Sequence, residues 1–259
     1  MAATAQTSAA TAKVAGLPMR VAVISDVHAN YRALEAVLEE IDAERVDAIW
    51  CLGDTVGYGP RPNECCDAVS SRSSYSLVGN HDLVVLGELS ISDFNDDAAE
   101  AAIWTSQVLT QESRAFLEPL EPAGEVAGVD LFHASARDPV WEYVLTEEAA
   151  RGTFELSDAS LILVGHSHVA LALSDKGGWV TGGVATAGSE VELEGRWLLN
   201  PGSVGQPRDG DPRAAWLLLD FDRRFAAFRR VPYSIDETQA EMRERGLPEP
   251  LAARLERGE

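Results

Sequence analysis

Five short apolar runs in this chain each lead into a polar motif built from histidine, aspartate or asparagine. The first run, residues 20–25, is rich in β-branched residues and is followed by Asp26-Val27-His28. Such runs are typical of buried strands, and Leu34, Leu38 and Ile41, which follow at helical spacing, predict an amphipathic helix. Alternating strands and helices imply an α/β fold with a partly parallel sheet. The motifs would then gather at the carboxyl ends of the strands, where ligands bind in open α/β sheets.

The rest of the chain continues this pattern. Residues 19–259 contain no convincing linker or internal repeat, so we expect a single domain. Residues 1–18 are rich in Ala and Thr, lack the apolar segment of a signal peptide and are expected to be a disordered tail. Further strands are expected at 46–51, 75–78, 126–132, 161–164, 169–173, 183–193, 196–199, 214–220 and 225–231, and helices opening at 60–63 and spanning 97–118, 146–155 and 235–245.

The charge balance restricts the partners. The chain has 21 basic and 42 acidic residues, a net charge of −21, and only two lysines, Lys13 and Lys176. Because binding to nucleic-acid phosphates needs clustered Lys and Arg, no nucleic-acid partner is expected. No run approaches the ~18 apolar residues of a membrane span, so no membrane partner is expected either. An acidic chain that binds a phosphorylated substrate needs a local positive centre, such as bound metal ions.

The cysteines indicate a reducing compartment. Cys51, Cys65 and Cys66 give no even disulfide framework, adjacent cysteines are poorly placed to bridge each other, and no CxxC spacing occurs. We interpret them as reduced thiols of a cytoplasmic protein.

All five histidines belong to one ordered set of motifs. Asp, Asn and His supply the oxygen and imidazole ligands that Mn, Fe and Zn accept. Seven such residues at five positions would suffice for two metal ions that share one carboxylate, an arrangement that cleaves phosphate esters. The motifs are, in chain order, Asp26-Val27-His28, Gly53-Asp54, Gly79-Asn80-His81-Asp82, His133 and Gly165-His166-Ser167-His168.

Taken singly, some of these motifs have ordinary explanations. Gly-Asp is common turn chemistry, and a lone His133 could be a core histidine. In extended backbone, however, Asp26 and His28 would point the same way and could bind one ion. His166 and His168 would be costly to bury unpaired and could contact two neighbouring ions. The order of all five motifs at strand ends therefore favours a metal site.

The ordered set resembles the calcineurin-like metallophosphoesterase family, whose pattern runs Asp-x-His, Gly-Asp, Gly-Asn-His-Asp/Glu, His, Gly-His-x-His. The likeness spans residues 20–231. It is greatest for the compact bacterial and archaeal phosphodiesterase-like branch, which also resembles this chain at Tyr58-Gly59-Pro60 and at residues 200–208. The resemblance implies a four-layer αββα sandwich of two mixed β-sheets.

The resemblance also implies a role for each residue. Asp54 would bridge two divalent transition metals, among which we favour Mn over Fe or Zn. His81 would not ligate, but would stand beside the leaving-group oxygen as a general acid or phosphate stabiliser. Arg208 is a candidate phosphate contact, with a solvated loop arginine as the alternative. One metal would be held by Asp26, His28 and His168, and the other by Asn80, His133 and His166.

The chain also departs from the family pattern. Ala29 and Ala134 stand where Gly is frequent, which are small changes. Gly57 and Tyr58 stand where protein Ser/Thr phosphatases and symmetrical dinucleoside-tetraphosphate hydrolases have Asp and Arg. In those enzymes the Asp would orient the histidine equivalent to His81 and the Arg would bind phosphate, so this departure argues against both activities.

We therefore expect a dinuclear metal-dependent phosphoesterase, in the first place a phosphodiesterase acting on a small phosphorylated metabolite. A metal-bound hydroxide would attack phosphorus in line. The alternatives are a phosphomonoesterase or protein Ser/Thr phosphatase with the same site, a nuclease, and a non-catalytic scaffold. The net charge disfavours the nuclease, and the complete ligand set disfavours the scaffold. No pattern indicates an oligomeric state.

Overall fold

The computed structural model describes residues 20–259, so the predicted tail at residues 1–18 lies outside the described residues. The strands are β1 Arg20–Ile24, β2 Ala48–Cys51, β3 Tyr75–Ser76, β4 Ala123–Val126, β5 Val129–Phe132, β6 Leu161–Val164, β7 Leu171–Asp175, β8 Val180–Val184, β9 Glu190–Glu192, β10 Arg196–Asn200, β11 Ala214–Asp220 and β12 Phe225–Val231. The helices are α1 Tyr31–Glu44, α2 Pro62–Arg72, α3 Asn80–Leu86, α4 Asp96–Val108, α5 Gln111–Leu117, α6 Glu147–Leu156, α7 Ile235–Glu244 and α8 Glu249–Ala253, with 3-10 helices η1 Ile91–Asp93 and η2 Arg254–Glu256.

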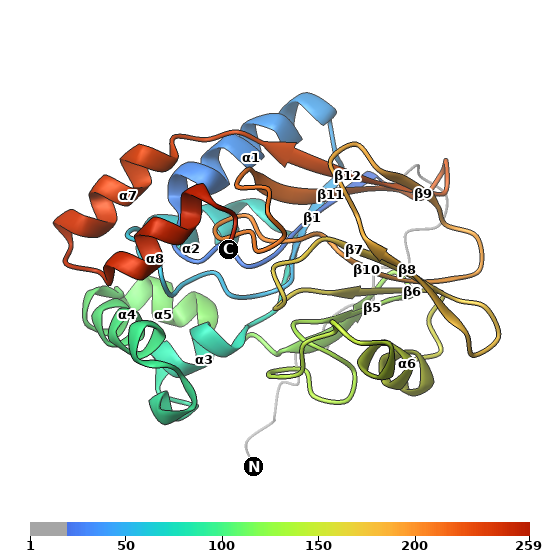
Figure 1. Cartoon of the computed structure of the whole chain (residues 1–259), viewed down its shortest axis with the longest axis horizontal. Helices are drawn as coiled ribbons and strands as arrows, with labels where there is room; N and C mark the ends of the chain where they lie inside the picture. Colours follow the sequence, from blue (N-terminus) through green and yellow to red (C-terminus); the bar gives the residue numbers. More distant parts are fainter. Residues whose placement is uncertain (1–19) are drawn as a thin grey trace, which may run out of the picture.

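The strands form two mixed six-stranded sheets, shown in Figure 1. The first has the order β3-β2-β1-β11-β12-β9, and the second has the order β4-β5-β6-β10-β7-β8. In the first sheet β1, β2 and β3 run parallel, and in the second β5, β6 and β10 do. The five predicted motifs follow β1, β2, β3, β5 and β6, and residues 200–208 begin at the end of β10. All of these segments therefore lie at the carboxyl ends of the parallel strands.

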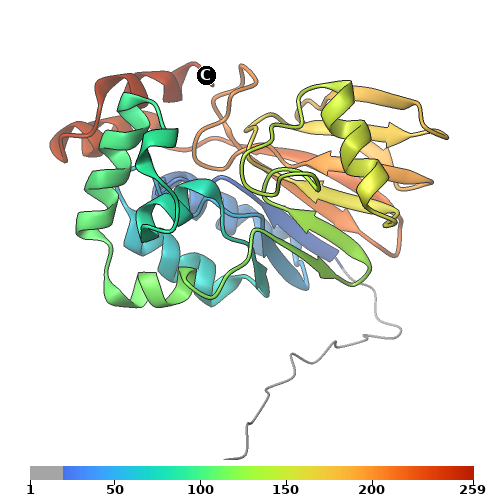
Figure 2. The ribbon, with the colours of Figure 1, turned by 90° about the horizontal axis from the view of Figure 1, so that it is seen from below.

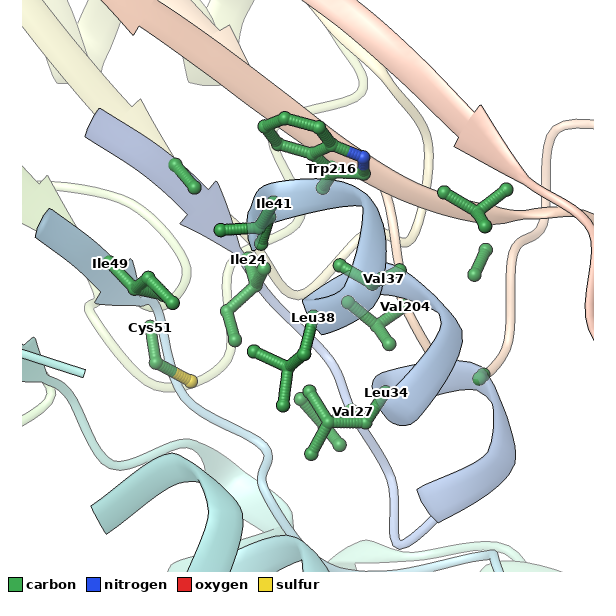
Figure 3. Close-up of a cluster of buried hydrophobic side chains, with 14 of the residues drawn as sticks. Ile24, Val27, Leu34, Val37, Leu38, Ile41, Ile49, Cys51, Val204 and Trp216 are labelled. Atoms are coloured by element: carbon green, nitrogen blue, oxygen red, sulfur yellow. The ribbon is translucent and has the colours of Figure 1, made fainter. Parts of the chain in front are cut away.

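Helix α1 covers the outer face of the first sheet. It begins after Asn30, whose side chain accepts a hydrogen bond from the Ala33 N–H and so satisfies a free donor of the first turn. Its apolar face, which includes Leu34 and Leu38, packs on strand residues such as Trp216 (Figure 3). The predicted amphipathic helix is confirmed.

Apolar side chains also fill the space between the sheets. Alternate residues of β6 serve the two faces of the second sheet: Leu161 and Leu163 pack toward the first sheet, whereas Ile162 and Val164 pack with Phe154 of α6. Figure 2 shows α6 lying along the outer face of the second sheet. The order helix, sheet, sheet, helix confirms the predicted αββα sandwich.

The C-terminal helices α7 and α8 lie beside α4 (Figure 1). Met242, Leu251 and Leu255 pack there against Ala101 and against Tyr58, from the loop after β2. Helix α7 was predicted from the sequence, whereas α8 and η2 were not. This packing brings the last residues of the chain to the loops that follow the parallel strands.

Three expected elements differ from the structure. The helix expected at 97–118 is two helices, because Leu109 is extended and Thr110 caps α5 by accepting the Ser113 N–H. The strand expected at 183–193 is wrong, because a turn containing Gly188 separates β8 of the second sheet from β9 of the first. The strand expected at 75–78 covers only Tyr75–Ser76.

Within residues 20–259, no helix has the length and apolar character needed to cross a membrane. The interpretation of residues 19–259 as one domain stays a prediction.

Candidate metal centre

The loops after the parallel strands bring six of the predicted ligands into two adjoining groups. Within each group, the ligand atoms lie within 4.8 Å of one another, and every residue is buried. Asp54 belongs to both groups. The first group is Asp26, His28, Asp54 and His168, and the second is Asp54, His133 and His166.

The backbone at these ligands is unusual. The φ angles of Asp26, His28 and Asp54 are 53°, 49° and 52°, and those of His166 and His168 are 61° and 58°. The expectation that Asp26 and His28 share a direction because the backbone is extended is therefore wrong. The left-handed conformation is unfavourable for residues other than glycine and persists where the surrounding structure enforces it, as at functional sites. Here it turns successive ligands of one motif inward.

The first group holds two imidazoles whose inner nitrogens face each other. His28 Nδ1 lies 3.2 Å from the Val56 carbonyl oxygen, and His168 Nδ1 lies 2.6 Å from the Gln206 carbonyl oxygen. Because a carbonyl can only accept, each Nδ1 carries the proton and each Nε2 presents a lone pair. The two Nε2 atoms are nevertheless 3.0 Å apart. A cation between them would relieve this repulsion, and metal-binding histidines commonly donate their outer N–H to a carbonyl in this way.

The second group repeats the arrangement. His133 Nδ1 donates to the Leu52 carbonyl at 2.9 Å, so its Nε2 presents a lone pair toward Asn80 Oδ1, 3.2 Å away, which is also an acceptor. His166 uses the opposite nitrogen, since its Nε2 donates to the Trp141 carbonyl at 3.2 Å and its Nδ1 is left to ligate. Asn80 thus lies beside the second group, and its role as a ligand stays a prediction.

Asp54 has one carboxylate oxygen without a partner. Its Oδ1 accepts the His81 N–H at 2.9 Å, but its buried Oδ2 has no hydrogen-bond partner among the described residues. That Oδ2 is 3.5 Å from His28 Nε2 and 3.6 Å from His133 Nε2. An unpaired buried carboxylate oxygen is costly, and this one lies between the two groups. The donor set therefore fits two cations that share Asp54.

Burial governs the charges of the site. It raises the pKa of Asp26 to about 7, and together with the charge of Asp82 it raises the pKa of Asp54 well above its usual range. Burial lowers the pKa of His166 to about 3, and that of His28 and His168 well below the usual range. The imidazoles are thus neutral with free lone pairs, and the carboxylates would be stabilised by positive charge bound between them.

Asp82 fixes two of the ligand loops. Its carboxylate accepts the N–H groups of Thr55 at 3.2 Å, Val56 at 2.9 Å and Gly79 at 3.0 Å. Gly79 itself must be glycine, because a Cβ there would overlap the Asp54 carboxylate. Asp82 belongs to one of the predicted motifs, but the sequence indicated no role for it. The structure shows that it ties the Asp54 loop to the Asn80 loop.

His81 belongs to neither ligand group, and its ring lies in an aromatic environment. Its ring lies 4.3 Å from that of Tyr58 and 4.4 Å from that of Phe94, measured between centroids. Its buried Nδ1 has no hydrogen-bond partner within residues 20–259. A Cβ on Gly57 would approach that nitrogen to 2.7 Å, so Gly57 makes room for the imidazole. Packing against the Tyr58 and Phe94 rings therefore positions His81. A carboxylate cannot do so here, because Gly57 stands where the related phosphatases have Asp.

The loop at residues 200–208 is joined by hydrogen bonds to the segments that carry the candidate ligands. Ser203 Oγ donates to the Asp26 carbonyl at 2.7 Å, and Asn200 Nδ2 donates to the Gly165 carbonyl at 2.7 Å. The backbone N–H of Arg208 donates to the His168 carbonyl at 3.1 Å. The Arg208 side chain reaches Gln206 Oε1 at 2.9 Å and does not extend freely into solvent. The loop thus holds ligands of both Asp-x-His and His-x-His motifs.

Residues between β5 and α6 complete the site without any motif in the sequence. The Trp141 carbonyl accepts a hydrogen bond from His166 Nε2. Tyr143 stacks on the His166 ring, with ring centroids 4.1 Å apart and planes at 15°. Tyr143 is 46% exposed, so it forms part of the rim. A loop without a repeating pattern gave no sequence signal for these contacts.

Comparison with known proteins identifies relatives of this chain in sequence and in structure. A model of the calcineurin-like phosphoesterase superfamily domain matches residues 19–224. The uncharacterized protein MJ0912 of Methanocaldococcus jannaschii is 38% identical over 240 residues, which cover 91% of this chain and 96% of that protein. The crystal structure of a metallophosphoesterase from Sphaerobacter thermophilus is 43% identical and superposes with a TM-score of 0.86, covering 94% of this chain and 100% of that one.

A more distant match is partial. A symmetrical bis(5'-nucleosyl)-tetraphosphatase of Nitrosococcus oceani is 28% identical over 139 residues, which cover 51% of this chain and 49% of that protein.

Proposed function

The chain belongs to the calcineurin-like phosphoesterase superfamily, and we propose that it is a phosphodiesterase that hydrolyses a small phosphorylated metabolite at a dinuclear metal centre. The observation that carries this proposal is the position of Asp54 Oδ2, unpaired and 3.5–3.6 Å from an imidazole nitrogen of each ligand group. A single-metal site would not need a carboxylate shared in this way.

We assign the ligands by their grouping. The first metal would be held by Asp26, His28 and His168, the second by Asn80, His133 and His166, and both by Asp54. Bound divalent cations would place positive charge against the phosphate oxygens and lower the pKa of water toward neutrality. Manganese is the metal we favour, although a mixed imidazole, carboxylate and amide set also suits Fe and Zn.

His81 would act on the leaving group. Its ring lies 4.8 Å from that of His28, close to the first group, yet it is not a member of either ligand group. Burial lowers the pKa of His81 well below its usual range, so the ring would take up a proton when the anionic substrate binds and pass it to the departing oxygen, which would stabilise the developing alkoxide. Tyr58 and Phe94 would hold the ring in place while the proton moves.

A diester fits this site better than a monoester. A phosphate monoester carries up to two negative charges at neutral pH, whereas a diester carries one. Tyr58 stands where the protein phosphatases have a phosphate-binding Arg, so this position itself supplies no positive charge for a dianion. The symmetrical tetraphosphatase of Nitrosococcus oceani matches this chain over only about half of its length.

We also propose that the protein is cytoplasmic and that its substrate is a small molecule and not a nucleic acid. All three cysteines are free and buried, which supports a reducing compartment. The net charge of −21 opposes binding of a polyanion.

The test is a substrate screen with metal-free protein reloaded with Mn²⁺, Fe²⁺ or Zn²⁺. Bis-p-nitrophenyl phosphate, p-nitrophenyl phosphate, cyclic nucleotides, a phosphopeptide and single-stranded DNA would be compared at equal concentration. We expect the first compound to be hydrolysed with a higher kcat/KM than the second, and this activity to vanish in Asp54→Asn. Faster turnover of p-nitrophenyl phosphate or of the phosphopeptide would contradict the proposal and indicate a phosphomonoesterase. Cleavage of DNA alone would indicate a nuclease. Absence of turnover with all three metals would indicate a non-catalytic role.

A further inference from the structure

Two arginines beside the candidate centre lack an acidic partner. Arg208 follows β10 and Arg254 begins η2, and neither lies within ion-pair distance of a carboxylate in the part of the chain that the structure describes. Asp209, the next residue after Arg208, is paired instead with the buried Arg230. In a chain with twice as many acidic as basic residues, two neighbouring unpaired guanidiniums need an explanation.

Both guanidiniums converge on one side chain. Arg208 Nη2 donates to Gln206 Oε1 at 2.9 Å, and Arg254 Nη1 donates to the same oxygen at 3.3 Å. Their carbon atoms Cζ lie 5.8 Å and 5.9 Å from the centroid of the Tyr58 ring. Two like charges that share one neutral oxygen repel each other, so the arrangement favours binding of an anion.

Unsatisfied donors are buried in the same cluster. Gln206 is 1% exposed, yet its Nε2 has no acceptor among the described residues, and neither has the buried Nε of Arg208. Buried N–H groups without a partner are costly. An incoming oxyanion is the group that would satisfy guanidinium and amide donors together.

The cluster adjoins the proposed reaction site. The Tyr58 ring, which the guanidiniums flank, lies 4.6 Å from the His28 ring and 4.3 Å from the His81 ring, between centroids. Arg208 is also bonded through its backbone to the His168 carbonyl. A group bound by the two arginines would therefore be a near neighbour of the phosphorus under attack.

We propose that Arg208, Arg254 and Gln206 form a second anion subsite, which holds a phosphate linked to the scissile one, so that preferred substrates carry two joined phosphates. This inference rests on the proposed phosphodiesterase function for the identity of the first phosphate. Arg254 is the new specificity-determining residue, supplied by the C-terminal 3-10 helix. The resulting substrate class is the pyrophosphate diesters, in which each phosphate bears one charge.

The first experiment measures the subsite without metal or catalysis. Metal-free protein is titrated with inorganic pyrophosphate by calorimetry, and wild type is compared with Arg254→Gln, Arg254→Lys and Arg257→Gln. Arg257 directly follows η2, is exposed and is paired with Glu259, so it controls for loss of nearby charge. We expect Arg254→Gln to weaken binding about tenfold, Arg254→Lys to weaken it less, and Arg257→Gln to change it little. Equal affinities in wild type and Arg254→Gln, with unfolding curves unchanged, would overturn the subsite.

The second experiment tests the substrate class with metal-loaded protein. The kcat/KM for ADP-ribose, a pyrophosphate diester, is compared with that for thymidine 5'-monophosphate p-nitrophenyl ester, which has one phosphate. We expect the ratio of the two constants to fall about tenfold in Arg254→Gln, chiefly through KM for ADP-ribose. An unchanged ratio, or ADP-ribose that neither reacts nor competes, would contradict the class. Wild type that cleaves neither ester but keeps the pyrophosphate affinity would overturn the phosphodiesterase function and leave the subsite standing.

Discussion

His28 Nε2 and His168 Nε2 lie 3.0 Å apart, although the outer nitrogen of each ring already donates to a backbone carbonyl. The two residues are 140 positions apart in the sequence, and they come from loops of different sheets. Two neutral imidazoles in these tautomers present lone pairs to each other, which is unfavourable without a cation. This pair is therefore the most direct indication of a metal position in the first ligand group.

Replacement of Asp54 should affect both metals, because its Oδ2 lies between the two groups. We expect Asp54→Asn to weaken both binding steps by more than about 100-fold, beyond the usual effect of an outer-shell residue. His28→Ala should weaken chiefly one step and His133→Ala the other. Stepwise Mn²⁺ titration of the metal-free variants, with elemental analysis of the loaded protein, measures this. Equal losses at both steps in all three variants would remove the case for a bridge.

Replacement of His81 should separate catalysis from metal binding. We expect His81→Ala to lower kcat by about 10²–10⁴, the range for a general acid, with metal content near that of the wild type. The loss should be smaller for p-nitrophenyl esters, whose leaving group needs little protonation, than for alkyl esters. Asn80→Ala is the matched control, since it should lose metal. A His81 variant that lacks one metal equivalent would identify the imidazole as a ligand.

Replacement of Asp82 should destabilise the fold. Its carboxylate accepts three buried N–H groups, and an amide in its place would turn an N–H donor toward one of them. We expect Asp82→Asn to lower the free energy of unfolding by about 2–4 kcal/mol in metal-free protein. Asp67→Asn, at an exposed position of α2, should change it little. Urea unfolding at constant m-value measures both, and equal midpoints would show that the three bonds contribute nothing net.

The thiols should resist modification in the folded protein. Burial raises the pKa of Cys51 to about 12, and the thiols of Cys65 and Cys66 are shifted in the same direction for the same reason. Because the folded state keeps the proton, this contribution to stability is complete below the unfolded pKa near 9 and is lost as the pH rises toward 12. At pH 8–9 we expect no rapid reaction with a disulfide reagent in buffer and three thiols per chain in 8 M urea. A rapidly reacting thiol in the native protein would contradict the burial.

The fold was largely predictable because its signals are local. Apolar runs such as residues 161–164 and the spacing of Leu34 and Leu38 identify strands and a helix without knowledge of the partner elements. The strand expected at 183–193 failed because both halves are β-prone, and only the three-dimensional structure shows that they join different sheets. Helix α8 is too short, at five residues, for periodicity to reveal it.

The candidate site was also predictable only in part. The candidate ligands could be predicted because short motifs carry them, and the structure brings six of them into two groups. Their left-handed backbone, the role of Asp82 and the Trp141 carbonyl could not be predicted, since each depends on contacts between distant loops. Arg254 was missed for the same reason: only the packing of α7 and α8 on Tyr58 brings the C-terminal segment to the site.

The first ligand group has a consequence for the order of events during synthesis. It needs Asp26, from the first strand, and His168, which follows the sixth, so more than half of the chain must emerge before that group can close. The two residues also belong to loops of opposite sheets, so the sheets must have docked. Metal uptake would then be a late step, open only to a chain that has emerged at least as far as His168, and a bound ion would mark a molecule whose two sheets have docked.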